Sequence, residues 1–266
     1  MRRSFASPAL VLRVRPSGES NREAFFLTAA EGIVGATLFG GPRSRLRSHV
    51  APFNSGILFS YRDPAKDFRK VSDFDVRSWR PGLRELYERS EAASGIAAAV
   101  LAGHGGGGAW TEALAIADAA LDAMESAGAE TCERIGLHFL WRWAALLGNR
   151  LDPGRCVSCG ADPGFGGSGG GTRGGNDGGG NDNGGGALWF IPGEGLLCKN
   201  CAVRSGAERA AFGAANYSSP FSGPALGPGA RRWLLAVQDR DPRELVRYTL
   251  DATSLGELRG LMAAIQ

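Results

Sequence analysis

The sequence predicts an α+β fold, in which a small barrel of five short strands precedes an α-helical C-terminal domain that carries an inserted four-cysteine segment. Three observations support this fold. The apolar pattern is that of short strands up to residue 76, it changes to helical spacing from Pro81 onward, and four of the five cysteines form two tight pairs. With 266 residues, 43% of them hydrophobic, the chain is long enough to bury a substantial core.

Five runs near the N-terminus are rich in branched and aromatic residues, and residues that favour turns separate them. The runs cover residues 9–14, 24–28, 33–39, 57–61 and 70–76. Because so small a sheet leaves its edges unpaired unless it closes, a barrel is favoured over a sandwich. A five-stranded barrel is typical of the OB-fold, whose surface binds oligonucleotides. We therefore predict an OB-fold nucleic-acid-binding domain over residues 1–79.

Apolar residues at three- and four-residue spacing predict a helical body over residues 80–150. Near the C-terminus, Asp241 and Ser254 are each followed three positions later by glutamate, which is the pattern of a helix capping box. We therefore predict short helices within residues 204–266, and we expect this segment to pack on the helical body.

The cysteine pairs are Cys156 with Cys159 and Cys198 with Cys201, each with a two-residue spacer. Two such pairs can supply the four sulfur ligands of a closed, structural Zn²⁺ site. The alternative for each pair is a redox dithiol, which normally lies at a helix start after a strand. The fifth cysteine, Cys132, lies in a helical pattern and is interpreted as an ordinary core thiol.

The zinc ribbon is predicted over residues 151–203, with residues 188–191 as its returning strand. Between the cysteine pairs, residues 164–186 are mostly glycine, asparagine, aspartate and serine. Such a segment buries too little apolar surface to offset its ordering entropy, so we predict a disordered loop there.

Cations gather in the loop after the third strand and around the next hairpin. If the loop is extended, its alternate arginines face the same way and can follow successive phosphates. The predicted DNA-binding residues are Arg43, Arg45, Arg47, Arg62, Lys66, Arg69 and Lys70. The alternative is that they are solvated loop charges. Nearby aromatic residues could stack on bases or belong to the core, namely Phe39, Phe53, Phe59 and Tyr61.

Composition and motifs argue against several other classes of protein. The net charge of +3 is too small to indicate a nucleic-acid partner by itself. No apolar run reaches the length of a membrane span, so we expect a soluble, cytoplasmic protein with no membrane partner. Paired carboxylates, a nucleophile elbow and a phosphate-binding loop are absent, so we expect no catalytic residues and no enzymatic activity.

The order of these features resembles the RecO family of DNA repair and recombination mediators. The resemblance lies in residues 27–34, 39–46 and 51–53 of the barrel, in residues 144–148 leading into 156–160, and in residues 190–198 and 226–230. It covers the chain except for its glycine tracts. The long glycine-rich insertion, and arginines where the family often has lysines, are departures from the family pattern.

The resemblance implies a nucleoid-associated mediator that binds single- and double-stranded DNA and anneals complementary strands. It also implies that the protein works with RecR, engages the acidic C-terminal tail of single-stranded-DNA-binding protein, and so indirectly helps to load RecA. A site for that tail needs apolar and cationic side chains together, for which the helical body offers Arg134, Phe139, Arg142 and Trp143. A protein adaptor whose barrel binds protein partners rather than DNA is the alternative, and a nucleic-acid enzyme is a third hypothesis.

Overall fold

The computed structural model describes residues 3–40, 44–104, 108–164, 186–211 and 223–265. By packing, the chain forms two compact units: residues 1–148 with 241–246, and residues 149–240 with 247–266. The barrel and the helical body, predicted as separate segments, therefore share one unit. None of the described helices is both long and apolar enough to cross a membrane.

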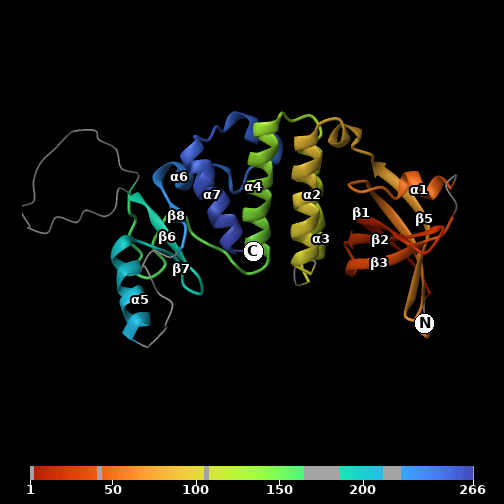
Figure 1. The fold of residues 1–266 in the computed structure, drawn as a ribbon, viewed down its shortest axis with the longest axis horizontal. Helices are drawn as coiled ribbons and strands as arrows, with labels where there is room; N and C mark the ends of the chain where they lie inside the picture. Colours follow the sequence, from red (N-terminus) through yellow and green to blue (C-terminus); the bar gives the residue numbers. More distant parts are fainter. Residues whose placement is uncertain (1–2, 41–43, 105–107, 165–185, 212–222, 266) are drawn as a thin grey trace, which may run out of the picture. The chain divides into compact units, whose positions relative to one another are not determined.

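The five predicted strands form a closed barrel, which confirms the predicted fold of the N-terminal domain (Figure 1). The strands are β1 (Ser4–Ser17), β2 (Asn21–Thr28), β3 (Gly32–Leu38), β4 (Ser55–Asp63) and β5 (Phe68–Ser78). Their order around the barrel is β1-β2-β3-β5-β4, and β1 pairs with β4 to close it. Strands β3 and β5 pair in parallel, and the other neighbouring strands pair antiparallel. Closure leaves the sheet without a free edge.

Alternation of side chains explains the barrel core. Phe26 of β2 and Phe74 of β5 point inward, are fully buried and lie 5.8 Å apart between ring centroids. Between β3 and β4 the short helix α1 (Arg45–His49) packs Leu46 against this core, followed by the buried Val50. Residues 45–49 are therefore helical and not extended as predicted, and the helical turn lets the half-buried Leu46 and the buried Val50 both reach the barrel core.

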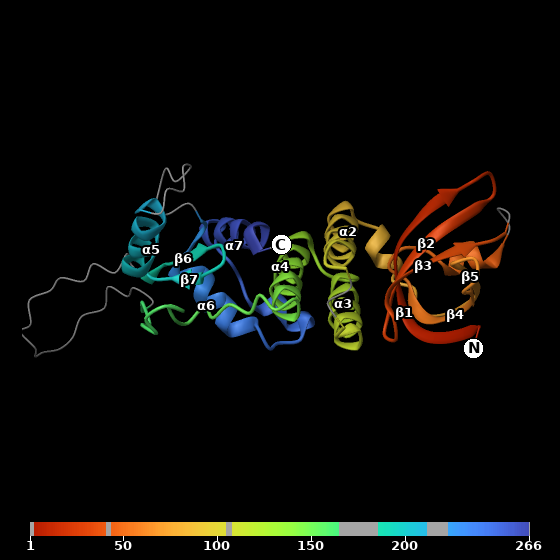
Figure 2. The same ribbon diagram turned by 90° about the horizontal axis from the view of Figure 1, so that it is seen from below.

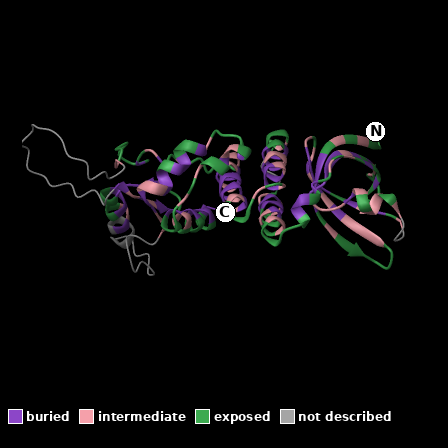
Figure 3. Cartoon of the chain, turned by 90° about the horizontal axis from the view of Figure 1, so that it is seen from above, coloured by how far each residue is buried: buried purple, intermediate pink, exposed green. Residues whose placement is uncertain are grey.

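Three helices follow the barrel within the same unit, and they confirm the helical body that the sequence predicted (Figure 2). A 3₁₀ turn, Pro81–Arg84, leads into α2 (Tyr87–Ala102), α3 (Trp110–Met124) and α4 (Ala129–Leu146). Their mutually packed faces are lined by buried apolar residues, drawn in purple in Figure 3. Cys132 is buried in α4, and its thiol lies 3.9 Å from the Met124 carbonyl oxygen, which confirms it as a core thiol.

A buried arginine joins the barrel to these helices. The side chain of Arg80, 1% exposed, donates from Nε to Asp122 at 2.6 Å and from Nη2 to Asp118 at 3.0 Å, both on α3. Its Nη1 donates to the Phe53 carbonyl oxygen at 2.6 Å and to the Ser55 hydroxyl at 2.7 Å. Burial raises the pKa of Asp118, although the neighbouring Arg80 charge acts to lower it. One guanidinium thus links the β4 region to two consecutive turns of α3.

The second unit contains a three-stranded sheet and further helices. Its elements are β6 (Leu188–Ile191), β7 (Gly195–Leu197), α5 (Lys199–Ala211), β8 (Ala225–Leu226), α6 (Pro228–Val237) and α7 (Ala252–Ile265). Strand β6 pairs with both β7 and β8, which confirms the predicted returning strand at residues 188–191. The predicted disordered loop lies, apart from its two end residues, outside the described residues.

The C-terminal helices begin differently from the capping-box prediction. Asp241 precedes a 3₁₀ segment, Pro242–Arg247, and accepts from the Arg243 backbone N–H at 2.8 Å. Helix α7 begins at Ala252, not after Ser254, and Asp251 caps it by accepting from the Ser254 N–H at 2.9 Å. The predicted start of this last helix was therefore wrong by one turn, because Asp251, three residues before Ser254, caps the helix in its place.

Candidate metal centre and nucleic-acid surface

The four paired cysteines converge on one point. The sulfur atoms of Cys156, Cys159, Cys198 and Cys201 all lie within 4.8 Å of one another. The first pair lies in a turn closed by the Gly160 N–H donating to the Cys156 carbonyl oxygen at 2.9 Å. Strand β7 ends directly before Cys198, and Cys201 lies in the first turn of α5. Sequence spacing therefore identified the whole cluster.

Burial, backbone N–H groups and the neighbouring sulfurs shift the pKa values of these thiols. Burial raises the pKa of Cys156, but backbone N–H groups of Cys198, Cys159 and Ser158 donate to its sulfur and lower the value to about 7. Burial and the neighbouring sulfurs raise the pKa of Cys201 to about 12. Four thiolates so close together repel one another, and a divalent cation at their centre removes that repulsion.

The sulfur geometry also fits a tetrahedral ion. The Cys159 and Cys198 sulfurs are 3.8 Å apart, and a tetrahedron with metal–sulfur bonds of about 2.3 Å has edges of about 3.8 Å. All five cysteines are free thiols. Cys198 does lie between a strand and a helix, as a redox dithiol would, but convergence of both pairs favours one shared metal ion. Because four protein ligands complete the shell, such an ion has no open position for water.

On the barrel, four of the predicted DNA-binding residues have exposed side chains. They are Arg45, Arg62, Lys66 and Lys70. Lys70 pairs across strands with Tyr61, and its ammonium nitrogen lies 5.4 Å from the centre of that ring. Lys70 is also the point where β5 meets Thr37 near the end of β3. We call Arg62, Lys66, Lys70 and Tyr61, all at the β4–β5 hairpin, the hairpin surface.

Two other predicted residues are engaged inside the domain. Arg47 donates to the backbone oxygens of Gly40, at 3.0 Å, and Ser20, at 2.5 Å, so it braces two loops. Arg69 makes a bidentate pair with Glu31, at 3.1 and 2.7 Å, and its side chain is only 10% exposed. Arg43 lies outside the described residues. DNA contact by any of these residues stays a prediction.

The aromatic candidates divide between surface and core. Phe39 is 45% exposed and Phe59 41% exposed, while Phe53 is buried. Phe39 lies beside Phe68, with 6.0 Å between ring centroids, at the start of β5 and therefore near Lys70. Phe59 instead pairs with Asp73 across β4 and β5, an acidic neighbour that disfavours a polyanion.

A second cationic and aromatic surface, not predicted from the sequence, lies on β1 and β2. The guanidinium carbons of Arg13 and Arg15 lie 5.0 and 5.1 Å from the centre of the Phe25 ring. Beside them a pocket of about 450 Å³ is also lined by Trp110 and His104. The signal was the arginine–valine–arginine alternation, which places both arginines on one face of a strand.

The predicted partner-binding residues are largely core residues. Phe139 and Trp143 stack on each other at 5.8 Å between ring centroids and are 1% and 2% exposed, so they form no open pocket. Arg134 is buried as well, and Arg142 is half-buried. Binding of a partner through these rings is therefore incompatible with their burial.

The same unit has a pocket of about 330 Å³ at the corner between α3 and α4. Its lining includes the apolar Ile135 and Val246, the latter 62% exposed, and the cation Arg243. Arg243 lies 3.6 Å from Asp122 and its side chain is 66% exposed. This pocket, and not the Phe139 stack, combines accessible apolar and cationic groups.

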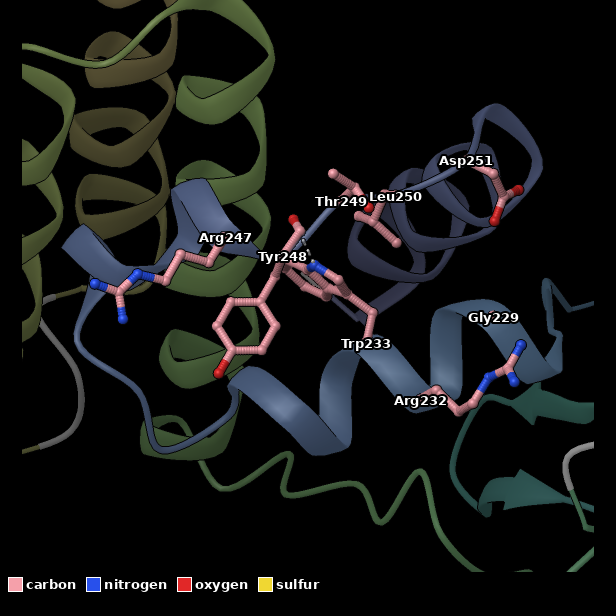
Figure 4. A pocket seen from close by; sticks show the side chains of 8 residues that line it. All are labelled: Gly229, Arg232, Trp233, Arg247, Tyr248, Thr249, Leu250 and Asp251. Carbon is pink, nitrogen blue, oxygen red and sulfur yellow. Dashed lines mark hydrogen bonds between the residues drawn. The ribbon is translucent and has the colours of Figure 1, made fainter.

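A further pocket, of about 370 Å³, lies in the second unit around Tyr248 (Figure 4). Arg232 and Arg247 line it, but their guanidinium groups point in different directions and do not converge on one anion. The Ser254 backbone N–H and hydroxyl donate to Asp251 and hold the pKa of that carboxyl below its ordinary value. Asp251 is thus engaged as the α7 cap.

Comparison with known families identifies the barrel. Residues 1–78 match the family described as recombination protein O N terminal, which covers β1 to β5. No curated protein matches the chain. A RecO N-terminal domain implies a role in DNA recombination and repair, and a closed barrel with exposed cations suits that role. Residues 1–78 are therefore a RecO N-terminal domain.

Proposed function

We propose that this protein is a non-catalytic recombination mediator that binds single- and double-stranded DNA and anneals complementary strands. In this proposal it acts in the cytoplasm with RecR, engages the tail of single-stranded-DNA-binding protein, and helps to load RecA. The observation that carries the proposal is that the closed barrel matches the RecO N-terminal family. In addition, the β4–β5 hairpin of this barrel displays lysines without an ion-pair partner among the described residues, beside aromatic rings. Cations that follow the phosphates, together with rings for base stacking, suit single strands of any sequence.

The metal centre is proposed to hold structural Zn²⁺. The four cysteine sulfurs would bind the ion, and the bound ion would fix the fold of the segment around β6 and β7 without taking part in chemistry. Borderline-soft Zn²⁺ suits a four-sulfur tetrahedron, whereas Mg²⁺ and Ca²⁺ require oxygen ligands.

DNA binding is tested by removing the exposed cations together. For the triple variant Arg45→Ala, Lys66→Ala and Lys70→Ala, we expect affinity for a fluorescent single-stranded oligonucleotide to fall by about tenfold or more at low salt. The slope of log K against log salt should become shallower by about 2, because each lost phosphate contact removes about 0.7. Fluorescence anisotropy at several salt concentrations measures both quantities.

The matched control is Arg77→Ala, since the Arg77 side chain is 69% exposed on β5 but pairs with Asp75 at 3.8 Å. It should leave the slope unchanged. Equal affinities for the wild type and the triple variant would contradict binding through these cations. Absence of DNA binding in the wild type, with salt-insensitive capture of RecR, would favour the protein adaptor instead.

For the acidic tail we propose the pocket between α3 and α4. Because Arg243 stands beside exposed apolar surface there, Arg243→Ala should weaken binding of an acidic peptide with an apolar C-terminus by about fivefold to tenfold, as loss of one charge-assisted contact does. Isothermal titration calorimetry measures the change. The control is Arg142→Ala, at a residue that the sequence predicted to bind the tail, and this variant should bind the peptide as the wild type does. If Arg142→Ala weakened binding and Arg243→Ala did not, the tail site would lie on α4 instead.

A further inference from the structure

Arg231 is a buried cation far in sequence from both cysteine pairs. It lies on α6, and its side chain is 0% exposed. A guanidinium has five N–H donors, and here each meets an acceptor. The contacts are Nε to Pro153 O at 2.7 Å, Nη1 to Gly164 O at 2.7 Å and Gly186 O at 2.5 Å, and Nη2 to Gly154 O at 3.2 Å and Asp162 Oδ1 at 3.4 Å.

These acceptors belong to three stretches of chain around the metal centre. Residues 153 and 154 come just before Cys156, residues 162 and 164 follow Cys159, and residue 186 precedes β6, which leads through the β6–β7 hairpin to Cys198. One side chain therefore holds both flanks of the first cysteine turn and the start of the strand that brings the second pair.

Among the described acceptors of Arg231, four are backbone carbonyl oxygens and one is the carboxylate of Asp162. Asp162 is the most distant of these, and its side chain is 60% exposed, so the backbone carbonyl dipoles contribute strongly to solvating the buried charge. Burying a charge without partners is strongly unfavourable, and the arrangement is stable only when all three stretches are in place together. The guanidinium thus couples their positions.

The same contacts bring together the two ends of the segment between the cysteine pairs. The carbonyl oxygens of Gly164 and Gly186 both accept hydrogen bonds from Nη1 of Arg231. Gly186 has a φ of +82°, and a Cβ there would lie 2.6 Å from the Gly164 oxygen, so glycine permits this close approach. The described residues on either side of that segment, Gly164 and Gly186, therefore lie in contact with each other.

We infer that Arg231 is the positioning residue of the metal centre, and that it makes assembly of the four sulfurs independent of residues 165–185. The inference rests on the proposed metal binding and goes beyond it, because it assigns the geometry of the site to a side chain that is not a ligand. Groups that orient metal ligands from outside typically change metal affinity by about 10- to 100-fold when removed.

The test uses the full chain and titration with Co²⁺, whose absorption reports tetrahedral sulfur ligation, followed by competition with Zn²⁺. Arg231→Met should weaken binding of both ions by about 10- to 100-fold and reduce the tetrahedral Co²⁺ absorption. Arg231→Lys has three donors in place of five and should recover part of the affinity. Replacing residues 165–185 with two glycines should leave affinity and spectrum within about twofold of the wild type.

Arg80→Met is the matched control, since Arg80 is equally buried but lies in the other unit, so it should lower stability without changing metal affinity. The inference would be overturned if both Arg231 variants bound the metal ions with wild-type affinity. It would also be overturned if shortening residues 165–185 lowered metal affinity as much as Arg231→Met does. If Arg231→Met does not fold, the lysine variant decides alone. A wild-type protein that binds neither ion would instead refute the metal proposal itself, which is a separate outcome.

Discussion

Replacing Cys156 and Cys198 by serine should abolish tight zinc binding and unfold the region around β6, β7 and α5. Structural zinc sites of this kind contribute about 10–16 kcal/mol of binding free energy at neutral pH, which is comparable with the whole stability of a domain, about 5–15 kcal/mol. The three- and four-residue strands there have too little sheet to fold without a cross-link. Zinc content per chain and hydrogen exchange of residues 188–206 measure the two effects.

Cys132→Ser is the matched control because Cys132 is a buried thiol outside the cluster. It should retain one zinc ion per chain and the wild-type exchange pattern. Amide exchange in the barrel, which belongs to the other unit, should stay slow in the double variant. Full zinc content in the double variant, or unchanged protection of residues 188–206 without zinc, would refute a structural metal.

Removing both carboxylates around Arg80 should destabilise the first unit by about 3–5 kcal/mol, the effect of leaving a buried charge without its partners. In the variant Asp118→Ala with Asp122→Ala, the guanidinium, 1% exposed in the wild type, loses both carboxylates and keeps the Phe53 carbonyl oxygen and the Ser55 hydroxyl as acceptors. Arg80→Met should be less harmful, because the charge leaves with the side chain and the two carboxylates, 32% and 33% exposed, can be hydrated.

Urea unfolding followed by tryptophan fluorescence gives these free energies. The control pair is Arg77 with Asp75, whose side chains are 69% and 61% exposed. Deleting it should change stability by no more than about 1 kcal/mol, since exposed ion pairs contribute little. A double aspartate variant as stable as the wild type would show that Arg80 does not hold the barrel on α3.

Patterns along the chain determined the elements and the metal ligands. Short runs of branched and aromatic residues between turn residues identified the five strands, because such side chains fit a pleated, half-buried surface. Two-residue spacing identified the four sulfurs, because that spacing lets both thiolates of a pair reach one ion. Both signals are local, so they needed no knowledge of the fold.

Only the tertiary structure decided which charged and aromatic side chains are accessible. Lys70 and Arg69 are sequence neighbours, yet one lies over a ring at the surface and the other pairs internally with Glu31. Phe139 and Trp143 have the composition of a docking site but belong to a core stack. Arg231 likewise has no local signal, because its acceptors lie 45 to 78 residues away. Burial and pairing depend on contacts between distant segments, and a one-dimensional pattern does not contain them.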